Sequence, residues 1–278
     1  MDKFRRNERM SAMLKILSDH PNRIYTLTYF CGLFNAAKST LSEDIDLLQK
    51  TIEDFGLGRL ETVTGAAGGV RYRMRVKPEE ALRDVRAMCE ELSGEARVLP
   101  GGFLFCSDLL AEPEPVRRMG EIIAARYYEA NPDFVLTMET KGIPVAMETA
   151  RGLGVPLVIA RRSSKVYEGP AVNINYVSAS SGSIQNMSLN RRAVKAGQRC
   201  LVVDDFLKGG GTAKGMMDLM REFDVTVAGM MFVIATEQDA DRRLPNTDSL
   251  MTFRLEGDRA LVSPAAWLEN AARIAAAR

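Results

Sequence analysis

Apolar residues recur every three or four positions along the first 57 residues, which is the spacing of one face of an α-helix. Three such stretches follow one another, with their apolar positions at 10–17, 27–34 and 41–55. Thr40 and Glu43 have the spacing of a capping box, and this pair predicts that the third helix begins beside them. The pattern therefore predicts three short helices.

The period changes from 3.6 to 2 after Gly58. Over residues 70–76, valine, tyrosine and methionine alternate with arginine, and a glycine-rich turn at 65–69 precedes them. This alternation predicts a β-hairpin. Three helices followed by a hairpin predict a winged helix-turn-helix, an α+β domain over residues 1–75.

A different organisation follows the hairpin. Pro78 stands where a helix would begin, and we expect residues 76–98 to form a helix that connects two domains. From residue 99 to 278, short apolar runs alternate with helical stretches, which predicts a doubly wound α/β sheet with ligands at the carboxyl ends of its strands. The expected parallel strands are 134–137, 157–160, 201–204 and 227–234, and the expected helices are 116–130, 143–151 and 212–223.

Composition narrows the class of protein. The chain has 278 residues, of which 46% are hydrophobic and 26% are charged, as in ordinary globular proteins. No apolar run reaches about 18 residues, so we expect no bilayer span and no membrane partner. Four scattered cysteines and a single histidine indicate neither a zinc site nor a disulfide framework, so we expect no metal site and a cytoplasmic location.

Charge is unevenly distributed. Residues 1–77 hold 13 Lys and Arg against 9 Asp and Glu, a local charge of +4, whereas the remainder holds 24 against 27, a local charge of −3. A basic N-terminal domain on a mildly acidic body favours a polyanionic partner for that domain.

The segment from Leu201 to Ala213 carries the most specific chemistry, and it reads LVVDDFLKGGGTA. A buried strand ends in Asp204 and Asp205, a glycine-rich loop follows, and a helix begins near Thr212. The loop and the helix N-terminus favour an anion, while the carboxylates accept hydrogen bonds from sugar hydroxyls. Paired aspartates before glycine turns also occur at strand ends without any ligand, but the complete order predicts a site for a phosphorylated sugar.

This order resembles the phosphoribosyl pyrophosphate motif of type I phosphoribosyltransferases. A second segment, Glu139 to Gly142, follows a strand and precedes a helix, as the pyrophosphate loop does in that family, where the loop often contains a non-proline cis peptide. Two departures concern catalysis: the family usually has a hydroxyl residue in place of Gly209 and a small or hydroxyl residue in place of Lys208. We also find no acid or base near the C-terminus that would activate a nucleobase, so we expect no catalytic residue.

Two stretches near this site are predicted to be loops. Residues 177–183 are small and polar, and residues 163–186 as a whole correspond to the family's flexible loop. The latter includes Lys165, Tyr167 and Glu168, to which we assign no role.

The whole chain resembles the bacterial purine operon repressors, on stretches 36–44, 98–102, 108–110, 139–142 and 204–212. The resemblance implies a winged helix joined to a type I phosphoribosyltransferase-like parallel sheet, a homodimer, and an effector domain that binds phosphoribosyl pyrophosphate without turning it over. The effector residues that it implies are Lys141, Asp204, Asp205, Lys208, Gly209, Gly210, Gly211, Thr212 and Ala213.

The second helix of a helix-turn-helix pair places its first turn against base edges in the major groove. Here that turn contributes Lys38, Ser39, Thr40 and Ser42. Hairpin and terminal arginines could reach the minor groove or phosphates, although a solvated hairpin face and a solvated terminus have the same composition. These further DNA candidates are Arg71, Arg73, Lys3 and Arg5, with Arg6 and Arg9 as additional phosphate contacts.

Two functions remain open at this point. The first is a DNA-binding repressor of purine biosynthesis and transport genes whose DNA affinity falls when it binds phosphoribosyl pyrophosphate, with Mg²⁺ as a candidate companion of that effector. The alternative is an active purine phosphoribosyltransferase with an appended nucleic-acid-binding domain. Whether a purine nucleotide competes for the effector site is also open.

Overall fold

The computed structural model describes residues 4–65, 68–163, 169–178, 182–237 and 244–277. The chain divides into two compact units: Met1–Lys77 with Arg151–Gly154, and Pro78–Ala150 with Val155–Arg278. None of the helices in the described ranges has the length and apolar character needed to cross a bilayer.

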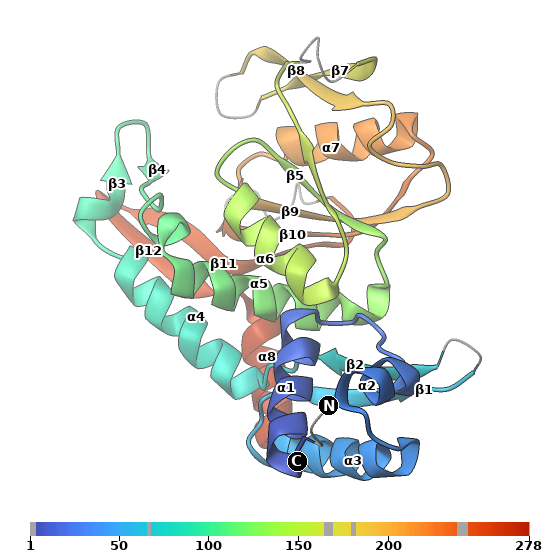
Figure 1. The fold of residues 1–278 in the computed structure, drawn as a ribbon. Coiled ribbons are helices and arrows are strands. Elements are labelled where there is room, and N and C mark those ends of the chain that lie inside the picture. The colour runs from blue at the N-terminus through green and yellow to red at the C-terminus, as the bar shows by residue number, and fades with distance from the viewer. Residues whose placement is uncertain (1–3, 66–67, 164–168, 179–181, 238–243, 278) are drawn as a thin grey trace. The chain divides into compact units, whose positions relative to one another are not determined.

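The first unit contains three helices and a two-stranded sheet, as predicted (Figure 1). The strands pair antiparallel, with Arg59 opposite Arg73. Met13, Phe30, Leu41 and Leu60 are almost completely buried, so every predicted helix and the hairpin contribute to one core. The elements are α1 (Arg6–Asp19), α2 (Leu27–Phe34), α3 (Lys38–Asp54), β1 (Arg59–Val63) and β2 (Gly69–Arg73).

The predicted capping box of the third helix is wrong. The helix begins at Lys38, and its N-cap is Ala37, whose backbone is extended and makes no side-chain capping bond. Thr40 therefore lies inside the first turn instead of capping it. The hydroxyl that does cap a helix here is that of Thr26, which accepts the Tyr29 backbone N–H of α2 at 3.1 Å.

The second unit is built on a six-stranded sheet in the order β12-β11-β10-β9-β5-β6. The four predicted strands are present and parallel, and they form the continuous run β10-β9-β5-β6 of the sheet. β11 adds a further parallel strand, whereas β12 pairs antiparallel with β11 at the sheet edge. The strands are β5 (Phe134–Met138), β6 (Leu157–Ala160), β9 (Arg199–Leu207), β10 (Thr226–Thr236), β11 (Thr247–Glu256) and β12 (Arg259–Pro264).

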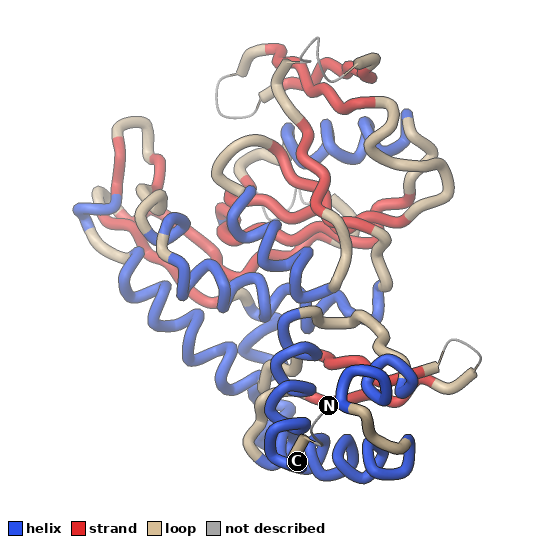
Figure 2. Tube along the Cα trace, viewed as in Figure 1, coloured by secondary structure: helices blue, strands red, loops and turns tan. Residues whose placement is uncertain are grey.

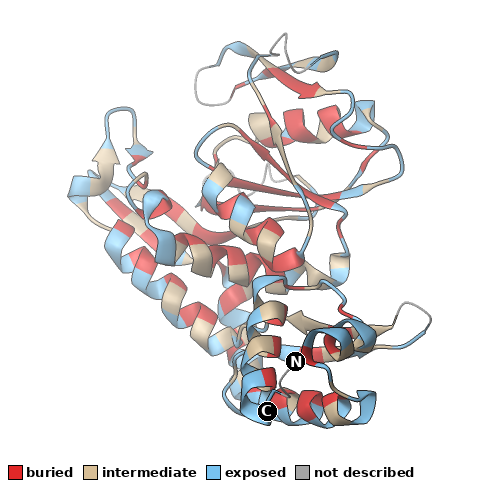
Figure 3. Cartoon of the chain, viewed as in Figure 1, coloured by how far each residue is buried: buried red, intermediate tan, exposed pale blue. Residues whose placement is uncertain are grey.

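Helices cover this sheet, with α7 above it and α5 below it in the view of Figure 1. The segment expected to connect two domains contains α4, which packs against α8 and β12 within the second unit. Figure 3 shows buried residues concentrated along the central strands and the helix faces turned toward them. The helices are α4 (Pro78–Leu92), α5 (Pro113–Tyr127), α6 (Ile143–Leu153), α7 (Gly211–Glu222) and α8 (Ala266–Ala276), with 3-10 turns at Glu95–Arg97, Leu109–Ala111 and Tyr128–Ala130.

In the described part of the second unit, two antiparallel hairpins lie outside the main sheet (Figure 2). One joins β3 (Val98–Leu99) to β4 (Phe103–Leu104), and the other joins β7 (Ala171–Val177) to β8 (Ile184–Asn190). The second hairpin corrects the prediction of a loop over residues 163–186, because much of that stretch is strand. Its apolar face packs on α7, where Tyr176 and Met187 join the same core as Met216. Residues 164–168 and 179–181, with Lys165, Tyr167 and Glu168, lie outside the described residues.

Candidate functional site

The two predicted ligand segments meet at one edge of the sheet. Strands β5 and β9 are parallel neighbours, with Leu136 opposite Val202. Parallel strands end at the same edge, so the loop after β5 and the loop after β9 lie side by side. Topology alone thus brings together residues that are more than sixty positions apart in the sequence.

A close contact joins these two segments. A methyl group added to Gly142 would lie 2.1 Å from Asp204 Oδ1 and 2.7 Å from Thr137 Oγ1, so this position excludes every side chain. Asp204 Oδ1 accepts the Thr137 hydroxyl at 3.4 Å and the Asp205 backbone N–H at 3.1 Å. Within the same loop, the peptide between Glu139 and Thr140 is cis, as is frequent in the family that the sequence resembles.

The paired carboxylates differ in their surroundings. Asp204 is buried, with 6% of its surface exposed, whereas Asp205 is half-buried and lines an open cleft. Burial raises the pKa of Asp204 well above its usual range, and the charge of Asp205 beside it raises that pKa further. Among the described residues no cation pairs with Asp204, and a buried carboxylate in such surroundings is typical of a site that a ligand completes.

The glycine loop has the backbone that an anion site needs. Gly209 and Gly210 both have positive φ, 64° and 72°, which glycine adopts without strain. Helix α7 begins directly after them, and Thr212 lies half-exposed in its first turn. The first turn of a helix presents backbone N–H groups and a partial positive charge to an anion. Ala213 is completely buried, so only its backbone could take part.

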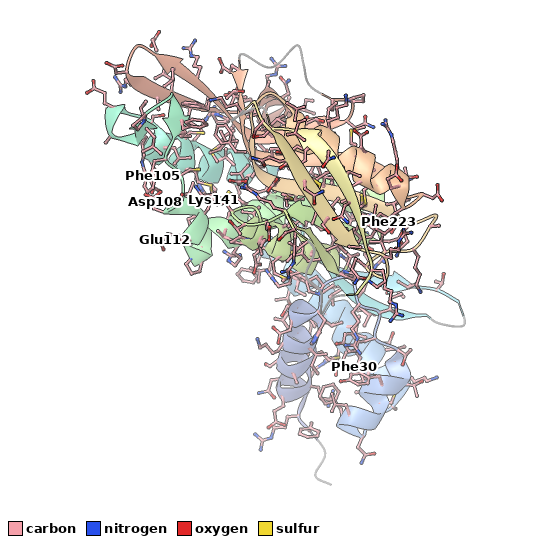
Figure 4. The ribbon with its side chains drawn as sticks, turned by 90° about the horizontal axis from the view of Figure 1, so that it is seen from above. Phe30, Phe105, Asp108, Glu112, Lys141 and Phe223 are labelled. Atoms are coloured by element: carbon pink, nitrogen blue, oxygen red, sulfur yellow. The ribbon has the colours of Figure 1, made fainter. Side chains whose placement is uncertain are left out.

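The cleft above these segments has a volume of about 400 Å³. It brings together four of the predicted effector residues, namely Lys141, Asp205, Lys208 and Thr212. Figure 4 shows Lys141 beside the segment that carries Phe105 and Asp108. Acidic and basic groups therefore face one cleft, as recognition of a sugar phosphate requires.

The remaining lining of the cleft was not predicted from the sequence. It is apolar and aromatic, and it comes from the β3–β4 hairpin and from Phe206. The Lys208 ammonium lies 3.9 Å from the centre of the Phe103 ring, within cation–π distance. The sequence stretch 98–102 resembles the repressor family, but nothing in its residue types indicated that the neighbouring Phe103 would contact the glycine loop.

One arginine holds the base of this hairpin. Arg97 donates to Asp108 Oδ2 at 2.6 Å and to the Glu91 backbone carbonyl at 3.1 Å, and its own carbonyl accepts the Phe105 N–H at 2.7 Å. Nearby, burial raises the pKa of the Cys106 thiol to about 11, so this cleft residue carries no negative charge at neutral pH. The hairpin is thereby anchored to α4 on one side and to the segment before α5 on the other.

Four of the predicted DNA-reading residues lie at the start of α3. Lys38, Ser39 and Ser42 are exposed at the start of α3, and Thr40 is half-buried among them. Arg5 is exposed before α1, where its backbone N–H donates to Glu8 at 2.6 Å. Lys3 lies outside the described residues.

The hairpin arginines bind Glu61, an acidic residue of the neighbouring strand β1 that no sequence pattern singled out. Arg71 donates to Glu61 Oε2 at 2.9 Å and 3.1 Å, and Arg73 donates to Glu61 Oε1 at 3.1 Å. Burial of Glu61 opposes its ionisation, but hydrogen bonds from both arginines outweigh burial and lower its pKa. Part of the positive charge assigned to the hairpin is therefore balanced within it.

The expectation that Arg9 contacts DNA phosphates is wrong. Arg9 is only 6% exposed, and it pairs with the fully buried Asp44 of α3 at 2.7 Å. Arg6 also binds Asp44, at 2.8 Å, although its side chain is half-exposed. The ion pair spans 35 positions, and no local sequence pattern indicates it.

Comparison with known proteins identifies relatives of both units. Residues 5–74 match the family model described as bacterial purine repressor, N-terminal, and residues 107–261 match the phosphoribosyl transferase domain. The purine biosynthesis transcriptional repressor PurR of Bacillus subtilis is 42% identical over 251 residues, covering 90% of this chain and 88% of that protein. The purine biosynthesis transcriptional activator PurR of Lactococcus lactis is 40% identical over 248 residues, covering 89% of this chain and 92% of that protein.

Solved structures resemble the second unit. The adenine phosphoribosyltransferase of Rhodothermus marinus superposes with a TM-score of 0.53 and 21% identity, covering 61% of this chain and 98% of that chain. This likeness confirms the predicted phosphoribosyltransferase-like fold.

Proposed function

Because this chain belongs to the family of bacterial purine repressors, we propose that it regulates purine biosynthesis by binding operator DNA and releasing it when phosphoribosyl pyrophosphate binds. The relatives named as repressors and activators are transcriptional regulators of purine biosynthesis, and so is this protein. Repression of biosynthesis and transport genes, and the identity of the effector, are the parts of the proposal that need testing.

The first unit binds the DNA in this proposal. The exposed first turn of α3 supports it, because Lys38, Ser39 and Ser42 offer an ammonium and two hydroxyls on one surface. Such groups bond phosphate oxygens and base edges when a recognition helix enters the major groove. A homodimer would place two such helices on the half-sites of one operator.

The second unit binds the effector. The single observation that carries this assignment is the cleft that Asp205 lines together with Lys141, Lys208 and Thr212 of the first turn of α7. We assign the ribose hydroxyls to Asp205 and Asp204, the 5′-phosphate to the glycine loop and Thr212, and the pyrophosphate to Lys141 and its loop. Each assignment pairs a charged or hydroxyl group of the ligand with a protein group of matching hydrogen-bonding character.

Magnesium would enter this site with the ligand. Within the described ranges, no group of three or more His, Cys, Asp or Glu side chains could hold a metal ion. Mg²⁺ commonly takes one or two carboxylates and completes its shell with phosphate oxygens and water. Asp204 and Asp205 could supply those carboxylates, so we place Mg²⁺ on the pyrophosphate. A purine nucleotide also has a ribose and phosphates, so it is a candidate competitor for the same cleft.

The proposed effector domain does not catalyse transfer. The regulator names of the relatives support this assignment, as do Lys208 and Gly209 in the glycine loop, where phosphoribosyltransferases differ. The alternative, an active purine phosphoribosyltransferase, predicts pyrophosphate release when the protein is mixed with phosphoribosyl pyrophosphate, Mg²⁺ and a purine base.

The test measures DNA binding and pyrophosphate release on the same preparation. A labelled duplex from upstream of this genome's purine biosynthesis genes is titrated with protein, with and without phosphoribosyl pyrophosphate and Mg²⁺. We expect tight binding that the effector weakens and that ribose 5-phosphate plus pyrophosphate does not. Unchanged DNA affinity would reject the effector assignment, and base-dependent pyrophosphate release would establish the alternative.

A further inference from the structure

The helix assigned to DNA recognition has the wrong charge for that task. Between Lys38 and Asp54, α3 carries two lysines and five carboxylates, a net charge of −3. Carboxylates within about 10 Å of DNA phosphates at 0.1 M salt are repelled by them. If α3 reads DNA, as proposed above, some other group must offset these charges.

Asp44 is the most buried of the five carboxylates, and it is fully compensated. Its two oxygens accept charge-assisted bonds from Arg9 at 2.7 Å and from Arg6 at 2.8 Å. Arg9 also donates to the Phe4 carbonyl at 2.8 Å, which fixes its guanidinium on the inner side of α1. Arg9 and Asp44 therefore belong to the core of the unit.

Arg6 differs from Arg9 because its side chain is exposed to solvent while it also binds the buried Asp44. Its side chain is 52% exposed, and besides Asp44 it reaches Glu43 Oε2 at 3.5 Å. Glu43 is 71% exposed and directly follows Ser42, which is also exposed, near the start of α3. One guanidinium thus contacts both the buried and the exposed carboxylate at the start of α3.

We propose that Arg6 is a positioning residue for DNA recognition, which acts by neutralising Glu43 at the start of α3 while Arg9 holds Asp44. In this role Arg6 contacts no phosphate itself. It removes the repulsion that Glu43 would exert on the DNA backbone, so that the ammonium and the hydroxyls at the start of α3 can meet the DNA.

The direct alternative is that Arg6 binds a phosphate, and a double-mutant cycle separates the two roles. The variants are Arg6→Gln, Glu43→Gln and their combination, each assayed for binding to the labelled operator duplex over a range of salt concentrations. We expect Arg6→Gln to weaken binding about fivefold, as for a lost exposed ion pair, and Glu43→Gln to leave it unchanged or stronger. The double variant should bind within about twofold of Glu43→Gln alone.

The salt dependence gives a second, independent readout. Loss of a phosphate contact lowers the slope of log affinity against log salt by about 0.9. We expect the double variant to retain the wild-type slope. If Arg6→Gln costs the same factor in both backgrounds and the slope falls, Arg6 binds phosphate and the inference is wrong.

Two controls distinguish a loss of charge from a loss of folding. Thermal unfolding identifies any loss of folding, and Arg6→Lys, which retains the charge, should recover most of the affinity lost in Arg6→Gln. If folded Arg6→Lys binds as weakly as Arg6→Gln, charge neutralisation is not the mechanism. A separate measurement tests the proposed function on which this inference rests. If the wild-type protein binds the operator no more tightly than a scrambled duplex, DNA recognition itself is refuted, whatever result the double-mutant cycle gives.

Discussion

Each unit of this protein buries one aspartate of central importance, and the two are treated in opposite ways. Asp44 in the first unit is completely buried and accepts bonds from two arginines at 2.7 Å and 2.8 Å. Asp204 in the second unit is buried as well, yet the described groups that bond it are a threonine hydroxyl and a backbone N–H, and its neighbour is the acidic Asp205.

This difference indicates that Asp44 serves the stability of the fold and that Asp204 serves ligand binding. A buried carboxylate that is paired with cations is part of the folded framework, since removing either partner leaves an uncompensated charge. A buried carboxylate without such a partner is a cost that folding alone does not explain, and it is typical of sites that bind ligands. Substitution of each aspartate can test whether Asp44 is a structural residue and Asp204 a ligand-binding residue.

The largest effect should come from breaking the pair in the first unit. Asp44→Asn keeps the side-chain shape but leaves Arg9 buried without its counter-ion, so we expect the free energy of unfolding to fall by about 3–5 kcal/mol. Chemical denaturation measures this change. Asp46→Asn, an exposed position on the same helix, is the matched control and should stay within about 0.5 kcal/mol of wild type. Equal effects of both substitutions would contradict the framework interpretation of Asp44.

The second effect concerns the response to the effector. Asp204→Ala combined with Asp205→Ala removes both carboxylates assigned to the ribose, and we expect DNA affinity to remain near that of wild type. The coupling between effector and DNA, typically about 1–3 kcal/mol, should disappear, which would give permanent repression in a cell. DNA titrations with and without phosphoribosyl pyrophosphate measure it. If this variant released DNA at the wild-type effector concentration, the carboxylates would not form the sensor.

A third expected effect is a loss of operator affinity when the first turn of α3 is changed. Thr40→Ala removes a hydroxyl from the first turn of α3, and we expect operator binding to weaken by about 1 kcal/mol while effector affinity is retained. Thr51→Ala makes the same change at an exposed position nearer the end of that helix, so it should leave operator binding unchanged. Loss of effector binding in folded Thr40→Ala would mean that the sites are assigned to the wrong units.

A fourth test follows the pH dependence of stability. Burial raises the pKa of Asp204 in the folded protein above its value of about 3.9 in the unfolded chain, so the folded state binds the proton more tightly. Its contribution to stability is full below about pH 3.9 and is lost as pH rises through the raised pKa. Asp204→Asn should therefore gain stability relative to wild type as pH increases from 4. Denaturant titrations at several pH values check this, and a difference that shrinks with pH would contradict it.

The smallest effect should come from Lys208. Its ammonium is half-exposed, and it already has the Phe103 ring as a partner. Lys208→Ala should weaken effector binding by less than about 1 kcal/mol, because salt screens a single exposed charge. Calorimetric titration at two salt concentrations measures the loss. A loss as large as that of the double aspartate variant would make Lys208 the principal phosphate ligand.

Local patterns predicted the elements whose periodicity is strong. The three helices, the hairpin and the strands β5, β6, β9 and β10 follow from apolar spacing, and the ligand site was placed from the order of residues 204–212. The strands β11 and β12 were missed, although Gly257 stands between two apolar runs, where a hairpin turn is common; in the structure it has a φ of 60°. The alternation of Val172, Ile174 and Tyr176 with asparagines likewise indicated a strand within the stretch predicted as a loop.

Other features could not be predicted from local patterns, because they depend on contacts between distant residues. The Arg9–Asp44 pair and the Lys208–Phe103 contact each join residues from separate elements of one unit. Charge and residue type allowed Arg9 to be a DNA contact as readily as a core residue. Only its burial, which the fold determines, decides between them.

The close approach of Gly142 to Asp204 has a consequence for how a ligand is bound. Fixing the backbone of one residue costs about 1–2 kcal/mol of conformational entropy. Because Gly142 packs directly on strand β9, the ends of both ligand loops are ordered when the sheet forms, and most of that entropy is lost on folding instead of on binding. The cleft is in this sense preorganised, and preorganisation raises the affinity for a small ligand without adding a contact. Substitution at position 142 would therefore lower the stability of the sheet and the affinity of the site together.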